Sequence, residues 1–157
     1  MVILLISILS AVALPNFFDF RTDARNSATF GALGGVRAAV AVARASISLK
    51  EAIGVPAYPT YAELTANQYA AGSHPVLAAL ASNFILDASA GIPVNPWSLS
   101  TVPISQWNSI WDCSALVKGA LDNTVGHQNI GWCYNQNNGQ FWANSDLNGS
   151  VPTENNY

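Results

Sequence analysis

The chain has 157 residues, enough for one domain with a buried core and an appendage. Charged residues make up 10% of it, against a usual figure of about 25%. Six basic and nine acidic residues leave a net charge of −3, with no basic patch to neutralise phosphates, so no nucleic acid is expected as a partner.

The N-terminus is an apolar stretch, MVILLISILSAVALPNFFDFR, in which the first charges are Asp19 and Arg21. Three interpretations compete: a secretory signal, a membrane span and an assembly helix. A signal cleaved near Ala13 would need a basic region before its apolar run, and this stretch has none. A span needs roughly 20 apolar residues, so Met1–Leu14 is long enough only if the helix continues through Pro15.

An amphipathic helix is predicted from about Phe17 to Ala52. Apolar residues recur there at steps of three and four and form one face, while the basic residues lie mostly off that face. Gly54 and Pro56 should end the helix. The predicted apolar face consists of Phe30, Leu33, Val36 or Arg37, Val40, Ala43 or Arg44, and Ile47.

Three glycines, Gly31, Gly34 and Gly35, lie inside this predicted helix. Each costs up to about 1 kcal/mol relative to alanine. They indicate either close packing or local bending of one helix, or a break into two helices.

Short elements punctuated by proline and glycine follow the long helix. One short helix should begin after Thr60, because Thr60 and Glu63 have the spacing of a capping box. A second short helix is expected from Pro75 to Phe84. The segment AGIPVNPWSLSTVP contains three prolines and is expected to be irregular.

A β-hairpin is predicted in the segment NIGWCYNQNNGQFWANSD. Its strands should be Ile130–Tyr134 and Gln140–Asn144, joined by a short turn. Trp132 and Tyr134 should share one face and Cys133 should lie on the other, since side chains alternate along a strand. A hairpin alone is marginally stable, so we expect further strands and the long helix to cover it.

The two cysteines, Cys113 and Cys133, lie twenty positions apart. This spacing fits neither a zinc knuckle nor a CxxC redox motif. It favours one disulfide in an oxidising compartment, with two buried free thiols as the alternative.

Catalytic signals are missing from the sequence, and no enzymatic activity is expected. The chain has no nucleophile elbow, zinc-protease motif, P-loop or dinucleotide-binding motif. His74 and His127 fall in loop-like segments and are expected to be exposed. The tryptophans should fill the core, with a carbohydrate-binding or protein-binding surface as the alternative. They are Trp97, Trp107, Trp111, Trp132 and Trp142.

Both ends of the chain resemble the type IV pilins and the pseudopilins of type II secretion. The segment ISILSAVALPNFFDFRTDAR is similar to the hydrophobic pilin helix, and IPVNPWS followed by GWCYNQNNGQFWANSD is similar to the C-terminal part of these subunits. The resemblance implies an α+β fold, the pilin α/β-roll, with a long N-terminal helix on a small antiparallel sheet. It implies a hydrophobic membrane and assembly helix at 1–22 and a periplasmic or extracellular globular domain at 23–157.

The function implied by the resemblance is a structural subunit of a type IV pilus or of a secretion pseudopilus. The subunit would wait in the bacterial inner membrane and then join a helical homo-oligomeric filament through the pilus or secretion assembly machinery. The filament would be an extracellular pilus or a periplasmic pseudopilus. The alternative is a secreted binding module released by cleavage near Ala13. Assembly would use Ile3, Leu4, Leu5, Ile8, Leu9, Val12, Leu14, Pro15, Phe17 and Phe18.

The resemblance also bears on the cysteines, on a metal and on the N-terminus. Many pilins close their C-terminal region with a disulfide similar to a Cys113–Cys133 pair. In SDLNGS, the oxygens of Asp146, Asn148 and Ser150 alternate and could bind Ca²⁺, as at the C-terminus of major pseudopilins, with a polar turn as the alternative. No other cofactor is expected. Family members begin with a leader peptide and a glutamate-bearing segment, so the true start is expected upstream.

Overall fold

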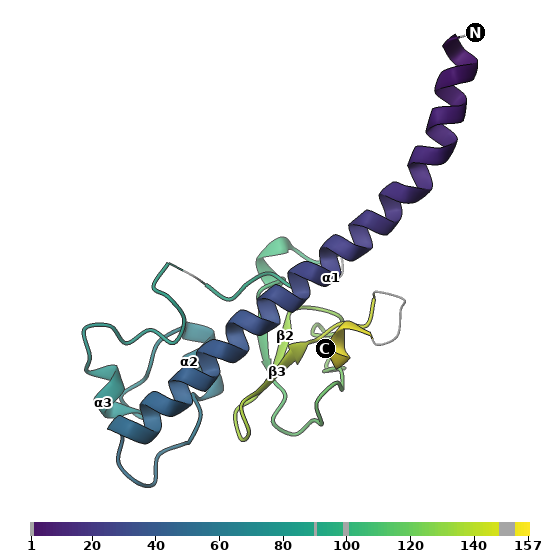
Figure 1. Cartoon of the computed structure of the whole chain (residues 1–157). Coiled ribbons are helices and arrows are strands. Elements are labelled where there is room, and N and C mark those ends of the chain that lie inside the picture. Colours follow the sequence, from purple (N-terminus) through teal and green to yellow (C-terminus); the bar gives the residue numbers. More distant parts are fainter. Residues whose placement is uncertain (1, 90, 99–100, 148–152) are drawn as a thin grey trace.

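One long helix, α1 (Val2–Lys50), dominates the computed structural model, and the rest of the chain folds against its C-terminal half (Figure 1). The structure describes residues 2–89, 91–98, 101–147 and 153–157, and within α1 it describes all side chains except those of residues 8 and 10–19. The N-terminal half of α1 extends beyond the folded domain as a curved rod (Figure 1). The fold therefore has two parts that share one helix.

Two short helices follow α1, namely α2 (Tyr61–Ala66) and α3 (Pro75–Ala78). The predicted capping box of α2 is confirmed, because the Thr60 hydroxyl accepts from the Glu63 N–H and the Glu63 carboxylate accepts from the Thr60 N–H at 2.8 Å. The second helix is shorter than predicted. Residues after α3 pair with the chain before it instead, through an antiparallel bridge between Gln68 and Phe84.

The sheet has three strands in the order β1-β2-β3. Strands β2 (Trp132–Asn135) and β3 (Gln140–Ala143) form the predicted antiparallel hairpin. Strand β1 (Ile110–Asp112) was not predicted, and it pairs with β2 in parallel. The expectation of an antiparallel sheet is therefore wrong, and the sheet is mixed. The described part of the chain also contains 3₁₀ turns at Ile104–Gln106 and Glu154–Asn156.

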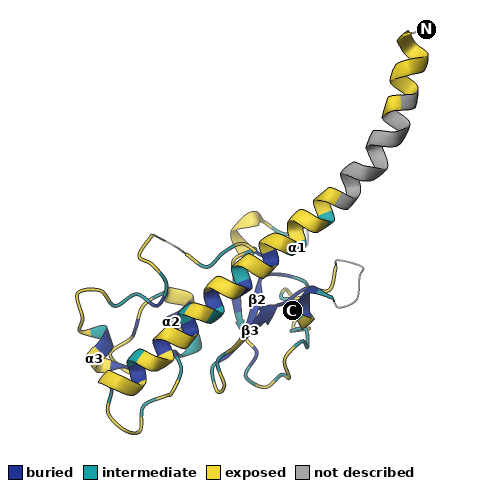
Figure 2. Ribbon diagram, in the orientation of Figure 1, coloured by how far each residue is buried: buried dark blue, intermediate teal, exposed yellow. Residues whose placement is uncertain are grey.

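The main core lies between α1 and one face of the sheet (Figure 2). Trp132 and Tyr134 face α1 from β2, and Phe141 faces it from β3, so each hairpin strand buries a large aromatic side chain there. Cys133 and Trp142 lie on the opposite face, as alternation along a strand requires. The predicted facing of the hairpin is confirmed. The helix contributes Leu33, Val36, Val40, Ala43 and Ile47.

The irregular segment around Asn95 is held by side chains of the hairpin region. The Trp132 indole donates to the carbonyl of Pro93 at 2.7 Å, and the buried Asn95 amide donates to the carbonyl of Gly131 at 2.7 Å. Gly131 has φ +66°, and a Cβ there would lie 2.2 Å from the carbonyl oxygen of Ser109, so only glycine fits. The proline-rich segment IPVNPWS is thus in contact with the β2–β3 hairpin region.

Candidate functional site

The C-terminal half of α1 has one buried face and one exposed face. The buried face matches the predicted stripe, except that Phe30 is 55% exposed and stacks on the ring of Tyr157. The exposed face includes Gly31, Gly34 and Gly35. The alternative of a break into two helices is wrong, because α1 is one helix. A Cβ at any of these glycines would meet nothing within 4 Å, so they do not pack closely within the described chain.

The described residues at the N-terminal end of α1 are coloured as exposed in Figure 2, and most of them are large and apolar. Of the residues predicted to drive assembly, Ile3, Leu4, Leu5 and Leu9 are between 61% and 84% exposed. The Ser7 hydroxyl donates to the carbonyl of Leu4 at 2.8 Å, so this polar group is satisfied within the helix. The other predicted assembly residues lie outside the described side chains: Ile8, Val12, Leu14, Pro15, Phe17 and Phe18.

One helix near the N-terminus, Phe20–Lys50 among the described residues, is long and apolar enough to cross a membrane. The core helix of a soluble domain passes the same test. Here one face of the segment packs on the sheet, and Arg37 donates to the backbone carbonyls of Phe141, at 2.9 Å, and of Tyr157. Lipid could not replace these contacts without unfolding the domain. The apolar stretch before Phe20 is therefore the better candidate for a membrane or an assembly interface.

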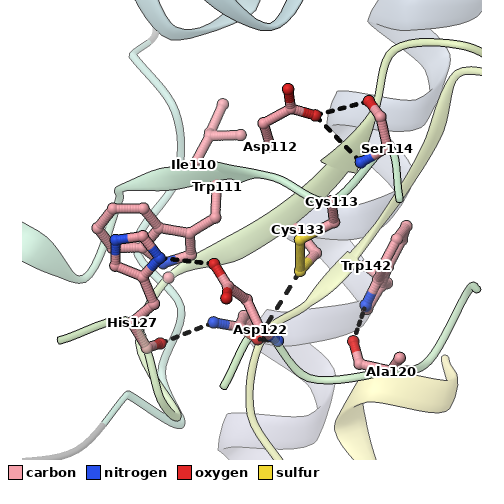
Figure 3. The surroundings of a disulfide bond; sticks show 12 residues. Ile110, Trp111, Asp112, Cys113, Ser114, Ala120, Asp122, His127, Cys133 and Trp142 are labelled. Carbon is pink, nitrogen blue, oxygen red and sulfur yellow. Dashed lines mark hydrogen bonds and ion pairs between the residues drawn. A yellow bond between two sulfur atoms is a disulfide. The ribbon is translucent and has the colours of Figure 1, made fainter. Parts of the chain in front are cut away.

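The disulfide joins Cys113 to Cys133, with 5.4 Å between their Cα atoms (Figure 3). It links the residue after β1 to the middle of β2, and both cysteines are completely buried. With Trp142, whose indole donates to the carbonyl of Ala120 at 2.9 Å, it forms a second small core on the face of the sheet away from α1. The predicted disulfide is present, and the alternative of two free thiols is wrong.

A groove of about 510 Å³ lies beside the disulfide and is lined in part by Trp111, Leu116, Asp122 and His127. The ring of His127 stacks on that of Trp111, with 3.6 Å between the centroids (Figure 3). Its Nδ1 lies 2.6 Å from a carboxylate oxygen of Asp122. His127 is therefore partly buried and paired, rather than free in solvent as predicted.

The Asp122 carboxylate holds this arrangement together. Burial acts to raise its pKa, but hydrogen bonds from the side chain and backbone of Thr124 and from the ring of His127 hold the pKa below its usual value. Asp122 is thus ionised at neutral pH and fixes the orientation of the imidazole. The groove joins an aromatic surface to a partly buried carboxylate, which leaves the predicted alternative of a binding surface open here.

The prediction that His74 is exposed is wrong, because its side chain is completely buried. Its Nδ1 lies 2.9 Å from both carboxylate oxygens of Glu63. Burial acts to raise the pKa of Glu63, but hydrogen bonds from the backbone of Ala70 and Thr60 and from the side chains of His74 and Thr60 hold it below its usual value. The capping-box spacing identified Glu63, and no local pattern marks His74 as its partner.

The proposed calcium ligands are only partly described. Asp146 is exposed, and its backbone N–H donates to the side chain of Asn129 at 3.0 Å. Asn148 and Ser150 lie outside the described residues. Among the side chains that the structure describes, which exclude that of Asp19, no group of three or more His, Cys, Asp or Glu could hold a metal.

The tryptophans divide between core and surface. Trp132 and Trp142 are completely buried and Trp97 is 5% exposed, so the expectation that they fill the core is confirmed for these three. Trp107 and Trp111 are only partly buried. Of these two, Trp111 lines the groove beside the disulfide.

Comparison with known proteins finds no match to the chain among protein-family models, curated proteins or solved structures.

Proposed function

We propose that this chain is a structural filament subunit of the type IV pilin or type II secretion pseudopilin kind, which assembles through the N-terminal part of α1. The observation that carries the proposal is the division of α1. Its C-terminal half is built into the domain, whereas the described side chains near its N-terminus are apolar and exposed. Residues 1–22 would act in the membrane and the filament, and residues 23–157 would form the globular part.

The exposed side chains of Val2–Ile6 and Leu9 make a second environment for this helix favourable. Burying an aliphatic side chain is worth roughly 1.5–3 kcal/mol, so these six residues together favour burial by on the order of 10 kcal/mol. A bilayer and the interior of a filament both remove such side chains from water. The same stretch would therefore serve in the inner membrane before assembly and among its copies afterwards.

The disulfide supports a location outside the cytoplasm. Cys113 and Cys133 are bonded, and such bonds persist in oxidising compartments such as the periplasm. This location suits both a surface pilus and a periplasmic pseudopilus, and both alternatives are retained in the proposal.

A secreted binding module is the second candidate, and the groove lined by Trp111 and His127 is the observation that favours it. The two candidates differ in the fate of the N-terminal stretch. A filament subunit keeps it, whereas a secreted module loses it at a cleavage site near Ala13.

Intact mass and N-terminal sequence of the protein isolated from its native cells would test the proposal. We expect the apolar stretch to be retained and the protein to sediment in fibres sheared from the cells or recovered from the periplasm. Leu5→Asp should abolish these fibres, since a charge on an apolar helix is costly in lipid and in a packed core. Val125→Asp is the matched control, because Val125 is 92% exposed on the domain. Soluble protein that begins near Leu14 would contradict the proposal.

A further inference from the structure

His74 and Glu63 connect three parts of the chain beside the end of α1. The Nδ1 of His74 lies 2.9 Å from each carboxylate oxygen of Glu63, in α2. Its Nε2 lies 2.9 Å from the backbone carbonyl oxygen of Pro56, in the loop after α1. Both side chains are buried, with exposed fractions of 0% and 1%. Both ring nitrogens therefore face oxygens at hydrogen-bond distance and away from water.

Neither oxygen partner can supply the protons for these contacts. A backbone carbonyl has none. The Glu63 side chain already accepts from the N–H and hydroxyl of Thr60, at 2.8 and 2.9 Å, and from the N–H of Ala70 at 2.7 Å. These hydrogen bonds hold the pKa of Glu63 below its usual value, so its carboxylate is ionised at neutral pH and has no proton to give. A neutral imidazole has one N–H, so in either tautomer it would direct a nitrogen lone pair at an oxygen. Only the imidazolium form of His74 donates on both sides.

Other titratable groups lie around the pair. The ring of Tyr69 lies edge-on to His74, with 5.8 Å between centroids, and burial raises the pKa of Tyr69 to about 12. Burial likewise raises the pKa of Tyr134 in β2, whose hydroxyl donates to the carbonyl of Pro59. From α1, Glu51 accepts the backbone N–H of Leu77 in α3 at 2.8 Å. Imidazole is the side chain that ordinarily changes charge between about pH 5 and 8, and His74 supplies the imidazole of this cluster.

We propose that the His74–Glu63 pair is a pH-sensitive lock that holds the segment from Pro56 to Leu77 against the C-terminal end of α1. Raising the pH removes the second ring proton and one of the two hydrogen bonds. The stabilisation from the imidazolium is therefore present on the acid side and is lost as the pH rises. In acid, the lock weakens again when Glu63 takes up a proton. The inference goes beyond the proposed function and does not depend on filament assembly.

The first test reads the protonation of His74 directly. Nitrogen-15 NMR of the full chain in nonionic detergent micelles at neutral pH distinguishes an imidazolium ring from either neutral tautomer. We expect both ring nitrogens of His74 to carry protons. A single neutral tautomer would overturn the proposal.

The second test reads the opening of the lock through amide hydrogen exchange at Ala70, whose N–H binds Glu63. After correction for the intrinsic pH dependence of exchange, the opening equilibrium should rise at least about tenfold between about pH 6 and about pH 9. His74→Gln should remove this rise, whereas His127→Gln, which alters the other histidine–carboxylate pair, should preserve it. A flat profile in the parent, or the same rise in His74→Gln, would overturn the proposal. If His74→Gln does not fold, the NMR measurement and the parent's exchange profile still decide.

Discussion

The two halves of α1 are built from similar residues and have opposite surroundings. Near the N-terminus, leucines and isoleucines are crowded together, with only Ser7 and Ser10 as polar residues between them, and those whose side chains are described are exposed. In the second half, apolar residues recur every three or four positions, and Leu33, Val40 and Ile47 are at most 3% exposed. The difference lies in spacing rather than in residue type. A stripe gives a helix one face for a small sheet to cover, whereas an all-round apolar helix has no single face of that kind.

This difference assigns two tasks to one helix. The second half stabilises the domain by packing on the sheet, and the first half is left to associate with lipid or with other copies. The two tasks should be separable by substitution, so a change in one half should leave the task of the other half intact.

The largest effect is expected from Trp132→Ala, because the side chain is completely buried between the sheet and α1 and its indole binds Pro93. The loss should be about 3–5 kcal/mol of unfolding free energy, measured by denaturant titration of the domain's near-ultraviolet signal. Val125→Ala, at a position 92% exposed, is the control. A denaturation curve equal to that of the parent would show that Trp132 does not face α1.

A matched pair of leucines compares the two halves directly. Leu33→Ala removes a side chain that is 1% exposed and should cost about 3 kcal/mol of unfolding free energy. Leu5→Ala, at a position 61% exposed, should change the stability of the domain by less than about 0.5 kcal/mol and should weaken association instead. Equal losses of stability in the two variants would remove the distinction between the halves.

Removal of the disulfide should destabilise the domain without affecting the first half of α1. The double substitution Cys113→Ala with Cys133→Ala opens a loop with a sequence separation of 20, which should cost about 3 kcal/mol on the loop-entropy argument. The bond lies on the face of the sheet away from α1, so sedimentation of the full chain should be unchanged. Loss of association in this variant would show that the two parts are coupled.

Glu63→Gln should have the smallest effect of the four, about 2 kcal/mol of unfolding free energy at neutral pH, because it weakens hydrogen bonds to a charged group. The folded-state pKa of Glu63 is lowered, so its stabilisation is present above the unfolded-state value and is lost as the pH falls through the folded-state value. The difference between parent and variant, measured by thermal unfolding, should therefore shrink as the pH falls below about 4.5. A difference that stays constant into acid would mean that the carboxylate charge is not involved.

Features that depend on residues close in sequence could be predicted. The capping box at Thr60, the apolar stripe of α1 and the β2–β3 hairpin each carry their signal within a few positions. Strand β1 could not be predicted, because three residues are too few to show a period and their partner strand follows about twenty positions later. The burial of His74 could not be predicted either, because its partners Pro56 and Glu63 are 18 and 11 positions away and meet it only in the fold.

The residues of the candidate assembly stretch could be predicted from the sequence, but whether their side chains are exposed or buried could not. Sequence identified the apolar stretch that contains Leu5 and Leu9, and the structure adds that these side chains are exposed while the later stripe is buried. The groove at Trp111 had no sequence signal beyond a cluster of tryptophans. Trp111 lies in β1, whereas Asp122 and His127 lie in the loop between β1 and β2, so only the folded loop stacks the ring of His127 on that of Trp111.

Paired sedimentation of the full chain and of the chain from Asp23 onward tests most directly whether the first half of α1 serves association and not folding. In buffer without detergent, we predict that the shortened chain is a folded monomer with its disulfide intact, whereas the full chain sediments with membranes or as fibres. The reason is that the shortened chain keeps the buried stripe of α1 and loses the exposed apolar stretch. A full chain that stays monomeric in that buffer, or a shortened chain that fails to fold, would contradict the account.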